Sequence, residues 1–394
     1  YNGGFIGTDG LDAPDPPTGV TPTAGNAQVS VAFTAPTDTG TSAITGFVAQ
    51  VSTDGTDYSG GSNTGSSSPI VVSSLTNGTA YTAKVWAINA YGTSAPSEAS
   101  DSFTPAILQR GLFAGGSSNV IDYVDITSAG NATDFGDLIA SDRFLGGFGS
   151  TTRGIFAGGD GTNRIQYVTI ATTGNATDFG DMSFTTDNNN EGGCSNSTRG
   201  MNAGGSSGGF LNNIDYVTIA STGNGTDFGN LTSARYGTSA LASPTRGVWS
   251  GGDTGSFQNV IDYVTISSTG NASDFGDLTN VRRGSSGLSS STRGVIGGSY
   301  TAPGSAPFFQ NLDYITIAST GNATDFGDAS TGFAEGAGTS GSTKGLFSLG
   351  YTGSLANTID QITIASTGNA TDFGDRTVSK YQGGATSSYH GGLQ

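Results

Sequence analysis

Six copies of the tripeptide Asp-Phe-Gly are the most conspicuous residues of this 394-residue chain that could do chemistry. The tripeptide binds metal in protein kinases, but here no glycine-rich phosphate loop and no His-Arg-Asp sequence accompanies it, which excludes that chemistry. Calcium is the remaining metal alternative, because two carboxylates three residues apart can bind it, yet the chain lacks an Asp-x-Asp-x-Asp-Gly loop. We therefore expect no metal and no cofactor. The expected role is architectural: Asn caps a turn, Phe packs between repeats and Asp accepts backbone N–H bonds.

Other catalytic constellations are also missing from the sequence. Glycoside hydrolysis needs two suitably placed carboxylates, for which Glu191 and Glu335 are candidates outside the repeated motifs, but no Ser-x-Asp-x-Gly-x-x-Trp box is present. One cysteine, Cys194, and one histidine, His390, exclude an intrachain disulfide, a cysteine-rich zinc site and a copper radical centre. The Asn-Ala-Thr sequences match glycosylation sequons, which a turn that needs Asn and Thr would produce by itself. The sequence predicts a protein that is not an enzyme.

Cations recur at one position of every repeat, where Arg or Lys precedes Gly. Two alternatives follow: a ring of cations that binds an anionic ligand, or pairing of each cation with a motif Asp of its own or the adjacent repeat. We favour pairing. The positions are Arg110, Arg153, Arg199, Arg246, Arg293 and Lys344.

The repeat itself predicts the elements that carry these residues. The Asn before each Ala-Thr (Gly-Thr or Ala-Ser in two copies) recurs 44 to 51 residues apart, and each repeat divides into four short extended segments. In the fourth repeat these segments are 235–242, 246–252, 260–267 and 272–278. Short strands, glycine turns and this period predict an all-β propeller of six blades.

The order of the four segments resembles a kelch repeat, with an Arg-started inner strand and a second strand that ends in Gly-Gly. The chain departs from that family in one respect, because Phe stands where Trp is more common. The first repeat begins at its second strand, so we expect residues 380–388 to supply the missing inner strand and close the ring. The Phe residues are Phe135, Phe179, Phe228, Phe275, Phe326 and Phe373.

A different pattern occupies residues 15–106, after an N-terminal segment of 1–14 and before the propeller at 107–394. The stretch from Leu75 through Tyr81 and Trp86 to Pro96 resembles the end of a fibronectin type III domain, with its corner Tyr and Val-x-Ala-x-Asn strand. The chain departs from that family at Phe33, where a core Trp is usual. The resemblance implies a two-sheet sandwich before the repeats.

Charge and composition limit the partners of the chain. A net charge of −17 disfavours nucleic acid and anionic lipid surfaces. No segment approaches the ~20 apolar residues of a membrane span. The first residues lack both Met and a signal-peptide pattern, so we expect a processed start or a portion of a longer chain.

Departures from the repeat predict where binding occurs. The loops between second and third strands vary in length and emerge on the same face as the fourth-to-first connections. Aromatic rings beside Arg suit sugars, and the alternative is that these rings dock a blade edge or another subunit. The candidate binding residues are Phe210, Phe257, Tyr300, Phe308, Phe309, Arg143, Arg235, Tyr236, Arg282, Arg283 and Tyr381, beside Lys380.

The combination of a fibronectin-like module with a Gly/Ser/Thr/Asn-rich kelch-like propeller resembles virion appendage proteins of tailed, particularly marine, bacteriophages. That resemblance implies a structural or adhesion protein at the virion surface, as a fibre, a neck or tail appendage or a capsid decoration. It implies other virion proteins as partners, a homo-oligomer and a host-surface glycan or protein as ligand. The alternatives are a secreted or surface-anchored bacterial adhesin and a glycan-cleaving enzyme.

Overall fold

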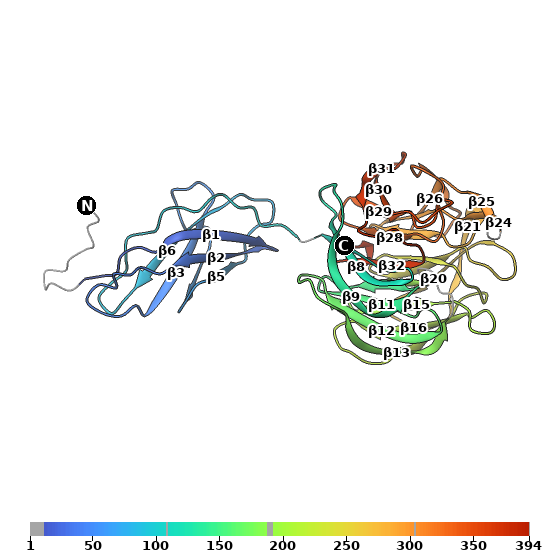
Figure 1. The fold of residues 1–394 in the computed structure, drawn as a ribbon, viewed down its shortest axis with the longest axis horizontal. Coiled ribbons are helices and arrows are strands. Elements are labelled where there is room, and N and C mark those ends of the chain that lie inside the picture. The colour runs from blue at the N-terminus through green and yellow to red at the C-terminus, as the bar shows by residue number, and fades with distance from the viewer. Residues whose placement is uncertain (1–11, 108, 187–191, 303–304, 394) are drawn as a thin grey trace. The chain divides into compact units, whose positions relative to one another are not determined.

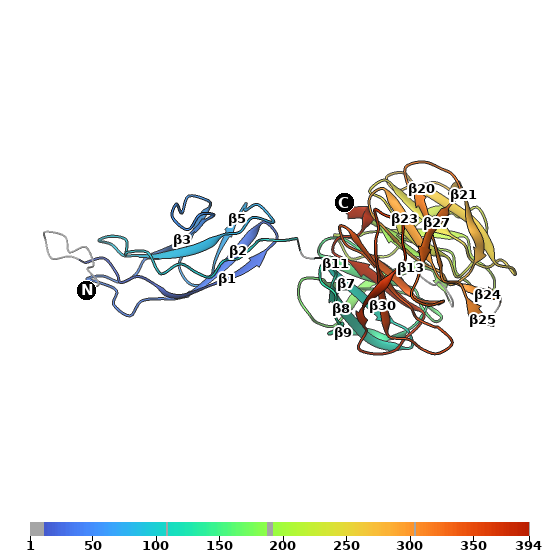
Figure 2. The same cartoon turned by 90° about the horizontal axis from the view of Figure 1, so that it is seen from above.

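The computed structural model describes residues 12–107, 109–186, 192–302 and 305–393. The chain divides into two compact units, Tyr1–Leu108 and Gln109–Gln394 (Figures 1 and 2). Apart from one 3-10 turn, η1 (Gly391–Leu393), every helix or strand element of these residues is a β-strand, and none is an α-helix. The prediction of an all-β protein is confirmed.

The first unit is a sandwich of two three-stranded sheets. One contains β1 (Thr18–Gly25), β2 (Gln28–Thr34) and β5 (Ile70–Ser73); the other contains β4 (Ser62–Gly65), β3 (Gly46–Ser52) and β6 (Thr82–Ile88). Alternate residues of β6 are buried, as expected of a strand with one face on a core. Phe33 lies in that core with its ring 4.8 Å from the ring of Phe47. The hydroxyl of Tyr81 accepts the N–H of Thr76 at 3.2 Å, which makes it a corner tyrosine.

The second unit contains six antiparallel sheets of four strands, numbered here 1 to 6, and a hairpin of β24 (Tyr300–Ala302) and β25 (Ser305–Phe308). In spatial order, sheet 1 is β32 (Gly383–Ser387), β7 (Arg110–Gly115), β8 (Ser118–Asp125) and β9 (Thr133–Asp142); sheet 2 is β10 (Gly146–Gly149), β11 (Arg153–Ala157), β12 (Thr162–Thr169) and β13 (Thr177–Thr186); sheet 3 is β14 (Gly193–Ser195), β15 (Arg199–Ala203), β16 (Asn213–Thr218) and β17 (Thr226–Asn230). Sheet 4 is β18 (Ser239–Ala242), β19 (Arg246–Ser250), β20 (Gln258–Thr265) and β21 (Ser273–Arg282); sheet 5 is β22 (Ser286–Ser289), β23 (Arg293–Gly297), β26 (Asn311–Thr316) and β27 (Thr324–Asp328); sheet 6 is β28 (Ala337–Ser340), β29 (Lys344–Ser348), β30 (Thr358–Thr363) and β31 (Thr371–Asp375).

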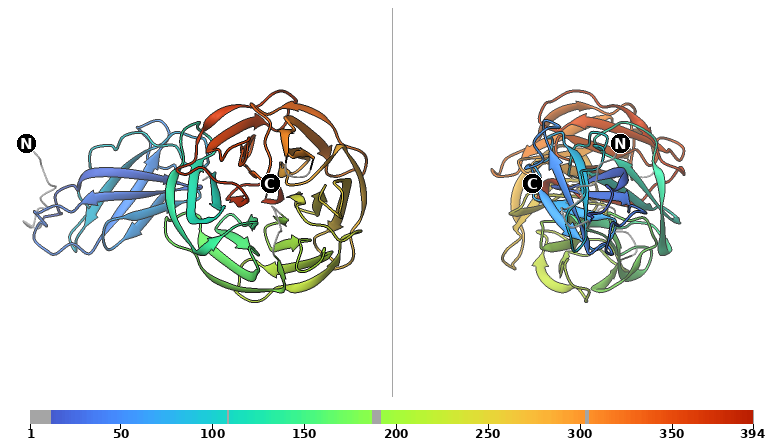
Figure 3. Two further views of the ribbon diagram at one scale, coloured as in Figure 1. Left: turned by 45° about the vertical axis from the view of Figure 1, so that its right-hand side comes forward. Right: turned by 90° about the vertical axis from the view of Figure 1, so that its left-hand side faces the viewer.

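The C-terminal strand β32 belongs to sheet 1, where it pairs with β7 in the register Gly384↔Ala114. The expected pairing of residues 380–388 with the first repeat is therefore observed. The first strands of successive sheets contact one another, and β32 contacts both β28 of sheet 6 and β10 of sheet 2. Figure 3, left, shows the six sheets arranged around a central axis. One boundary was predicted wrongly: β18 begins at Ser239 and not at Arg235.

The Asp-Phe-Gly tripeptide joins each sheet to the next one. Phe135 is buried, and a Cβ on Gly136 would lie 2.4 Å from the carbonyl oxygen of Gly174 in the following sheet, so only glycine allows this approach. The N–H of Asp137 donates to Oδ1 of Asn175 at 3.0 Å. The same backbone-to-Asn bond recurs between all neighbouring sheets, including sheets 6 and 1, which settles the architectural role of the motif.

The repeated cations were expected to pair with motif aspartates, and this expectation is wrong. The guanidinium of Arg246 instead donates to the carbonyl oxygen of Ile317 at 2.8 Å and lies 4.6 Å from the ring centre of Tyr263. Arg110, Arg153, Arg199 and Arg293 make the same two contacts, and Lys344 donates to Thr127. The carbonyl oxygen of a residue within the β-turn, Ile317 for Arg246, supplies an acceptor without a second buried charge.

The Asp of the Ile-Asp-Tyr motif is buried and accepts hydrogen bonds from the preceding sheet. Asp262 accepts the N–H of Thr232 at 3.0 Å and its hydroxyl at 2.6 Å. Asp262, Asp313 and Asp122 also pair with a buried cation. Asp215 and Asp360 pair with no cation in the described part of the chain, and burial raises the pKa of both carboxyls.

Candidate functional site

Loops at one end of the inner strands bring aromatic side chains from successive sheets into contact. The ring of Phe210 stacks on that of Tyr236 at 5.6 Å, and the ring of Phe308 lies 5.6 Å from Tyr351. Tyr351 in turn lies 6.1 Å from Tyr381. We call this set the aromatic face; its members are Phe210, Tyr236, Phe257, Tyr300, Phe308, Tyr351 and Tyr381, with Arg143 and Arg283 between them.

Two sequence positions build most of this face. One position lies two or three residues before the first strand and is occupied by Arg143, Tyr236, Arg283, Ala334 and Tyr381 in sheets 2, 4, 5, 6 and 1. Counted seven residues from the repeated cation, the other is occupied by Ser117, Asp160, Ser206, Asp253, Tyr300 and Tyr351 in sheets 1 to 6. The face therefore arises where the architectural repeat leaves side chains free to vary.

Arg283 lies at the centre of the aromatic face. Its guanidinium donates to the hydroxyl of Tyr236 at 2.8 Å and lies within 6 Å of the rings of Tyr236, Phe257 and Tyr300. The carboxylates of Asp253 and Glu335 each lie 3.6 Å from it. Such cation–π and ionic contacts hold the rings in place, and they leave Arg283 no net charge to offer an anion.

Glu335 is buried beside Arg283 in a backbone conformation that favours glycine, with φ at 51°. Gly237 and Gly284 occupy the equivalent positions of sheets 4 and 5 with φ of 67° and 65°. The side chain of Glu335 accepts a bond from Gln382 at 2.7 Å, and burial raises the pKa of its carboxyl. The equivalent residues of sheets 2 and 1, Phe144 and Gln382, also have a φ of 60°, and the side chain of Glu335 bridges Arg283 and Gln382.

Several predicted residues do not belong to the aromatic face. Arg235 and Arg282 were predicted at the surface, and this is wrong: both are fully buried, paired with Asp262 at 2.9 Å and Asp313 at 3.1 Å. Lys380 is buried near Asp122, and burial lowers its pKa to about 8. Phe309 is partly buried, with its ring 5.5 Å from the guanidinium of Arg282.

The two acids considered for catalysis, Glu191 and Glu335, do not form a catalytic pair among the residues that the structure describes. Glu191 lies outside the described residues. Glu335 and Asp253 are both buried and both directed at Arg283, which provides a structural role for the pair. Among the residues that the structure describes, no group of three or more His, Cys, Asp or Glu side chains could hold a metal ion.

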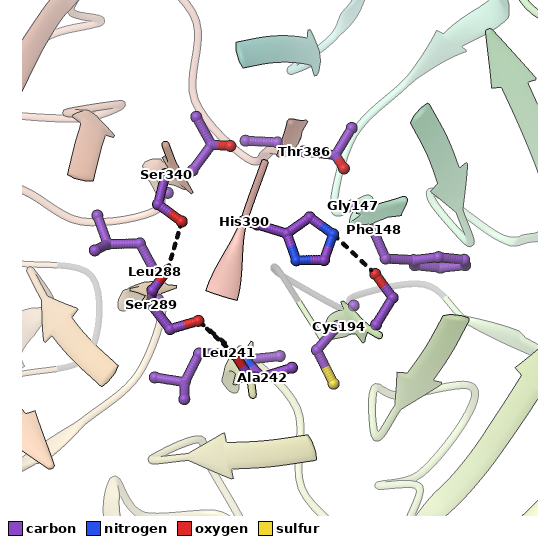
Figure 4. Close-up of a pocket in the computed structure, with 17 residues that line it drawn as sticks. Gly147, Phe148, Cys194, Leu241, Ala242, Leu288, Ser289, Ser340, Thr386 and His390 are labelled. Atoms are coloured by element: carbon purple, nitrogen blue, oxygen red, sulfur yellow. Dashed lines mark hydrogen bonds between the residues drawn. The ribbon is translucent and has the colours of Figure 1, made fainter. Parts of the chain in front are cut away.

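A small cavity of about 50 Å³ lies among the inner strands on the central axis (Figure 4). The imidazole of His390 reaches it from the C-terminal segment, where Nε2 donates to the carbonyl oxygen of Gly149 at 3.0 Å and Nδ1 accepts the N–H of Gly392 at 3.2 Å. This pattern fixes the neutral tautomer, and burial lowers the pKa of His390 to about 4. The hydroxyls of Thr339 and Thr386 line the cavity without a protein partner, so the space suits ordered water.

Some residues of this end of the second unit were not anticipated from sequence. Asp160, Tyr351 and Gln382 all contact predicted residues. Aligning the repeats on the Arg-Gly dipeptide would have found Asp160 and Tyr351, because it places them level with Asp253 and Tyr300. No described helix is long and apolar enough to cross a membrane.

Comparison with known proteins identifies one part of the chain. No curated protein matches the sequence. A crystal structure of titin domains matches with 28% identity over 24% of this chain, at a TM-score of 0.23, and the match spans a third of that titin chain. Residues 15–103, which include β1 to β6 and the corner Tyr81, match the fibronectin type III domain family. The first unit is therefore a fibronectin type III domain.

Proposed function

We propose that residues 109–394 form a six-bladed, kelch-like β-propeller and that the protein is a non-enzymatic adhesion protein that binds carbohydrate through its aromatic face. The propeller interpretation is supported by six four-stranded sheets of one topology, by contacts between successive inner strands and by the insertion of β32 into sheet 1. A propeller whose last strand completes its first blade leaves no unpaired inner edge.

The observation that carries the binding proposal is two series of ring contacts on the aromatic face, Phe210–Tyr236 and Tyr300–Phe308–Tyr351–Tyr381, which the guanidinium of Arg283 joins. Phe210 is 43% exposed, and Tyr236, Phe257, Tyr351 and Tyr381 are partly exposed. Aromatic rings offer flat apolar surfaces to the C–H faces of sugars, while neighbouring polar groups bind the hydroxyls. The buried acids at Arg283 favour a binding role over catalysis, because neither carboxylate is free to act on a ligand.

The setting that we propose is the surface of a tailed bacteriophage, where the protein would be a virion appendage or decoration that contacts the host. The two modules of the chain, a sandwich and a repeat domain that carries loops, suit a spacer with an exposed head. Mass spectrometry and immunogold labelling of purified particles test this setting. Labelled particles would support it, whereas recovery of the protein only from cell envelopes would contradict it and favour a bacterial adhesin.

Binding itself is tested with immobilised polysaccharides and two aromatic variants, Phe210→Ala and Tyr351→Ala. Taken as equal to that of an aromatic pair, the contribution of each ring–sugar contact is about 0.5–1.5 kcal/mol, so each variant should bind roughly twofold to twelvefold more weakly. Tyr91→Ala is the matched control, because Tyr91 is a 49% exposed aromatic residue of the first unit. Unchanged binding by both variants, or equal loss in the control, would contradict the proposal.

A further inference from the structure

We infer that Arg143 and Asp160, beside Tyr381, form the subsite that reads two neighbouring hydroxyl groups of a neutral hexose. The inference rests on the proposed carbohydrate-binding function and names the ligand class and the polar contacts of that same face. It begins with a comparison of the two arginines that the face contains.

Arg143 and Arg283 occupy equivalent positions in sheets 2 and 5, but only Arg143 is open to a ligand. Arg283 is 18% exposed and is enclosed by three rings and two carboxylates. The Arg143 side chain is 37% exposed and, among the residues that the structure describes, has a single carboxylate partner, Asp160, at 2.9 Å between Nε and Oδ2.

The same contrast holds for the two aspartates. Asp160 and Asp253 both follow a Gly-Gly pair in the loop between second and third strands. Asp253 is buried against Arg283 and Tyr236, whereas the side chain of Asp160 is 48% exposed. Gly159 and Gly161 flank Asp160 with φ of 133° and 77°, so the backbone there takes a tight path that presents the carboxylate outward.

The pair is set among rings. The guanidinium of Arg143 lies 5.2 Å from the ring of Phe144, and it interacts with the hydroxyl of Tyr381. Tyr381 contacts Tyr351, so the pair lies at one end of the aromatic face. A sugar stacked on Tyr381 and Tyr351, which are partly exposed, would place its hydroxyls beside a donor and an acceptor that are already hydrogen-bonded to each other.

The chemistry of the pair selects neutral sugars. A hydroxyl group both donates and accepts, so of two adjacent hydroxyls one can donate to Asp160 and the other can accept from Arg143. A uronic or sialic acid carboxylate would instead be repelled by Asp160, in a protein whose net charge is −17. Arg283, the other cation of this face, already lies beside two carboxylates, those of Asp253 and Glu335.

Substitutions of Arg143 and Asp160 should have little effect on folding, so their effect on binding can be measured. An exposed ion pair contributes about 0–1 kcal/mol to stability. Asp160→Asn and Arg143→Gln should therefore unfold at nearly the wild-type temperature. Asp101→Asn removes an exposed carboxylate of the first unit and serves as the charge-matched control.

The experiment measures binding of the full chain to dextran and galactomannan, which are neutral, and to polygalacturonate, which is anionic. We expect wild type to bind a neutral polysaccharide, and each variant of the pair to bind it at least about tenfold more weakly, since hydrogen bonds to charged groups are involved. Asp160→Asn should also bind polygalacturonate more tightly than wild type does, because it frees the Arg143 charge.

Failure of this inference differs from failure of the proposed function. If Phe210→Ala and Tyr351→Ala weaken binding of a neutral polysaccharide while Asp160→Asn and Arg143→Gln do not, the face binds sugar and the subsite is wrong. Preference of wild type for polygalacturonate would also overturn the subsite. Binding of none of the three polysaccharides by wild type would overturn both proposals.

Discussion

Replacement of Arg235 by Met should destabilise the second unit by about 3 kcal/mol at pH 7. Arg235 and Asp262 are both fully buried and 2.9 Å apart, so the variant leaves a buried carboxylate without its cation. Removing one partner of a buried ion pair costs about 3–5 kcal/mol. The lower end is expected here, because Asp262 keeps its two hydrogen bonds from Thr232.

The deficit should shrink as the pH falls. In the variant Asp262 resembles Asp215 and Asp360, whose pKa is raised by burial without a cation. A carboxyl whose pKa is higher in the folded state than in the unfolded state takes up protons on folding, so its penalty is relieved at low pH. The stability difference between wild type and variant should therefore be smaller at pH 5 than at pH 7.

Tryptophan fluorescence during urea unfolding measures the loss of stability in the second unit. Trp249 lies on β19 and pairs with Asp262 of the neighbouring strand β20, whereas Trp86 belongs to the fibronectin type III domain. A Trp86→Phe background leaves Trp249 as the reporter, which avoids mixing the transitions of two units.

Two companion variants isolate the ionic contribution. Asp262→Asn combined with Arg235→Met keeps the acceptor for Thr232 and removes the charge, so most of the loss should be recovered. Arg246→Met is the matched control: Arg246 donates to a carbonyl oxygen, and about 1 kcal/mol should be lost with little dependence on pH. A deficit below 1 kcal/mol for Arg235→Met, or one of equal size at pH 5 and pH 7, would refute this reasoning.

Two further predictions concern the central axis. Burial lowers the pKa of His390 to about 4, so its contribution to stability is complete above the unfolded pKa near 6.5 and falls as the pH drops toward 4. Wild type should lose about 2 kcal/mol more than His390→Gln between pH 7 and pH 4.5 in urea titrations, and parallel curves would contradict this. Gly147→Ala should lower the free energy of unfolding by about 3 kcal/mol in thermal or urea unfolding, because its Cβ would lie 2.2 Å from the carbonyl oxygen of Ala385. Gly209→Ala is the control and should leave stability unchanged, because the space around Gly209 is open. Equal effects of the two substitutions would refute the packing argument.

The periodic part of the fold could be predicted from sequence because each repeat carries the same structural residues at the same spacing. Buried Phe, glycine at a close approach and Asn at a turn recur at fixed spacing, which predicted six repeats, four strands in each and the pairing of the last strand with the first repeat. The Arg-Gly contacts were predicted wrongly, because spacing alone does not distinguish a carboxylate partner from a carbonyl oxygen of the next sheet.

The candidate site could be predicted only in part, because at two places in the chain one of two consecutive residues is buried and the other lies on the aromatic face. Arg235 and Arg282 are buried, while the residues that follow them, Tyr236 and Arg283, contribute to the aromatic face. No periodicity distinguishes the members of these pairs, since Arg235, Tyr236 and Arg283 lie in connections before first strands and Arg282 is the last residue of β21. Which residue turns inward depends on a buried Asp of the third strand that follows in the sheet, Asp262 or Asp313, and that contact is long-range.

The insertion of β32 into sheet 1 also sets the order in which the molecule can be completed. During synthesis, β7 emerges early and must wait for residues 383–387, more than 260 residues later, before its inner edge is covered. Until then the nascent chain exposes an unpaired strand edge, which is the form of backbone that chaperones shield and that proteases and neighbouring chains attack. A chain that stops before Gly383 would lack one strand of sheet 1, so premature termination before β32 should be as damaging to the second unit as a deletion within its core.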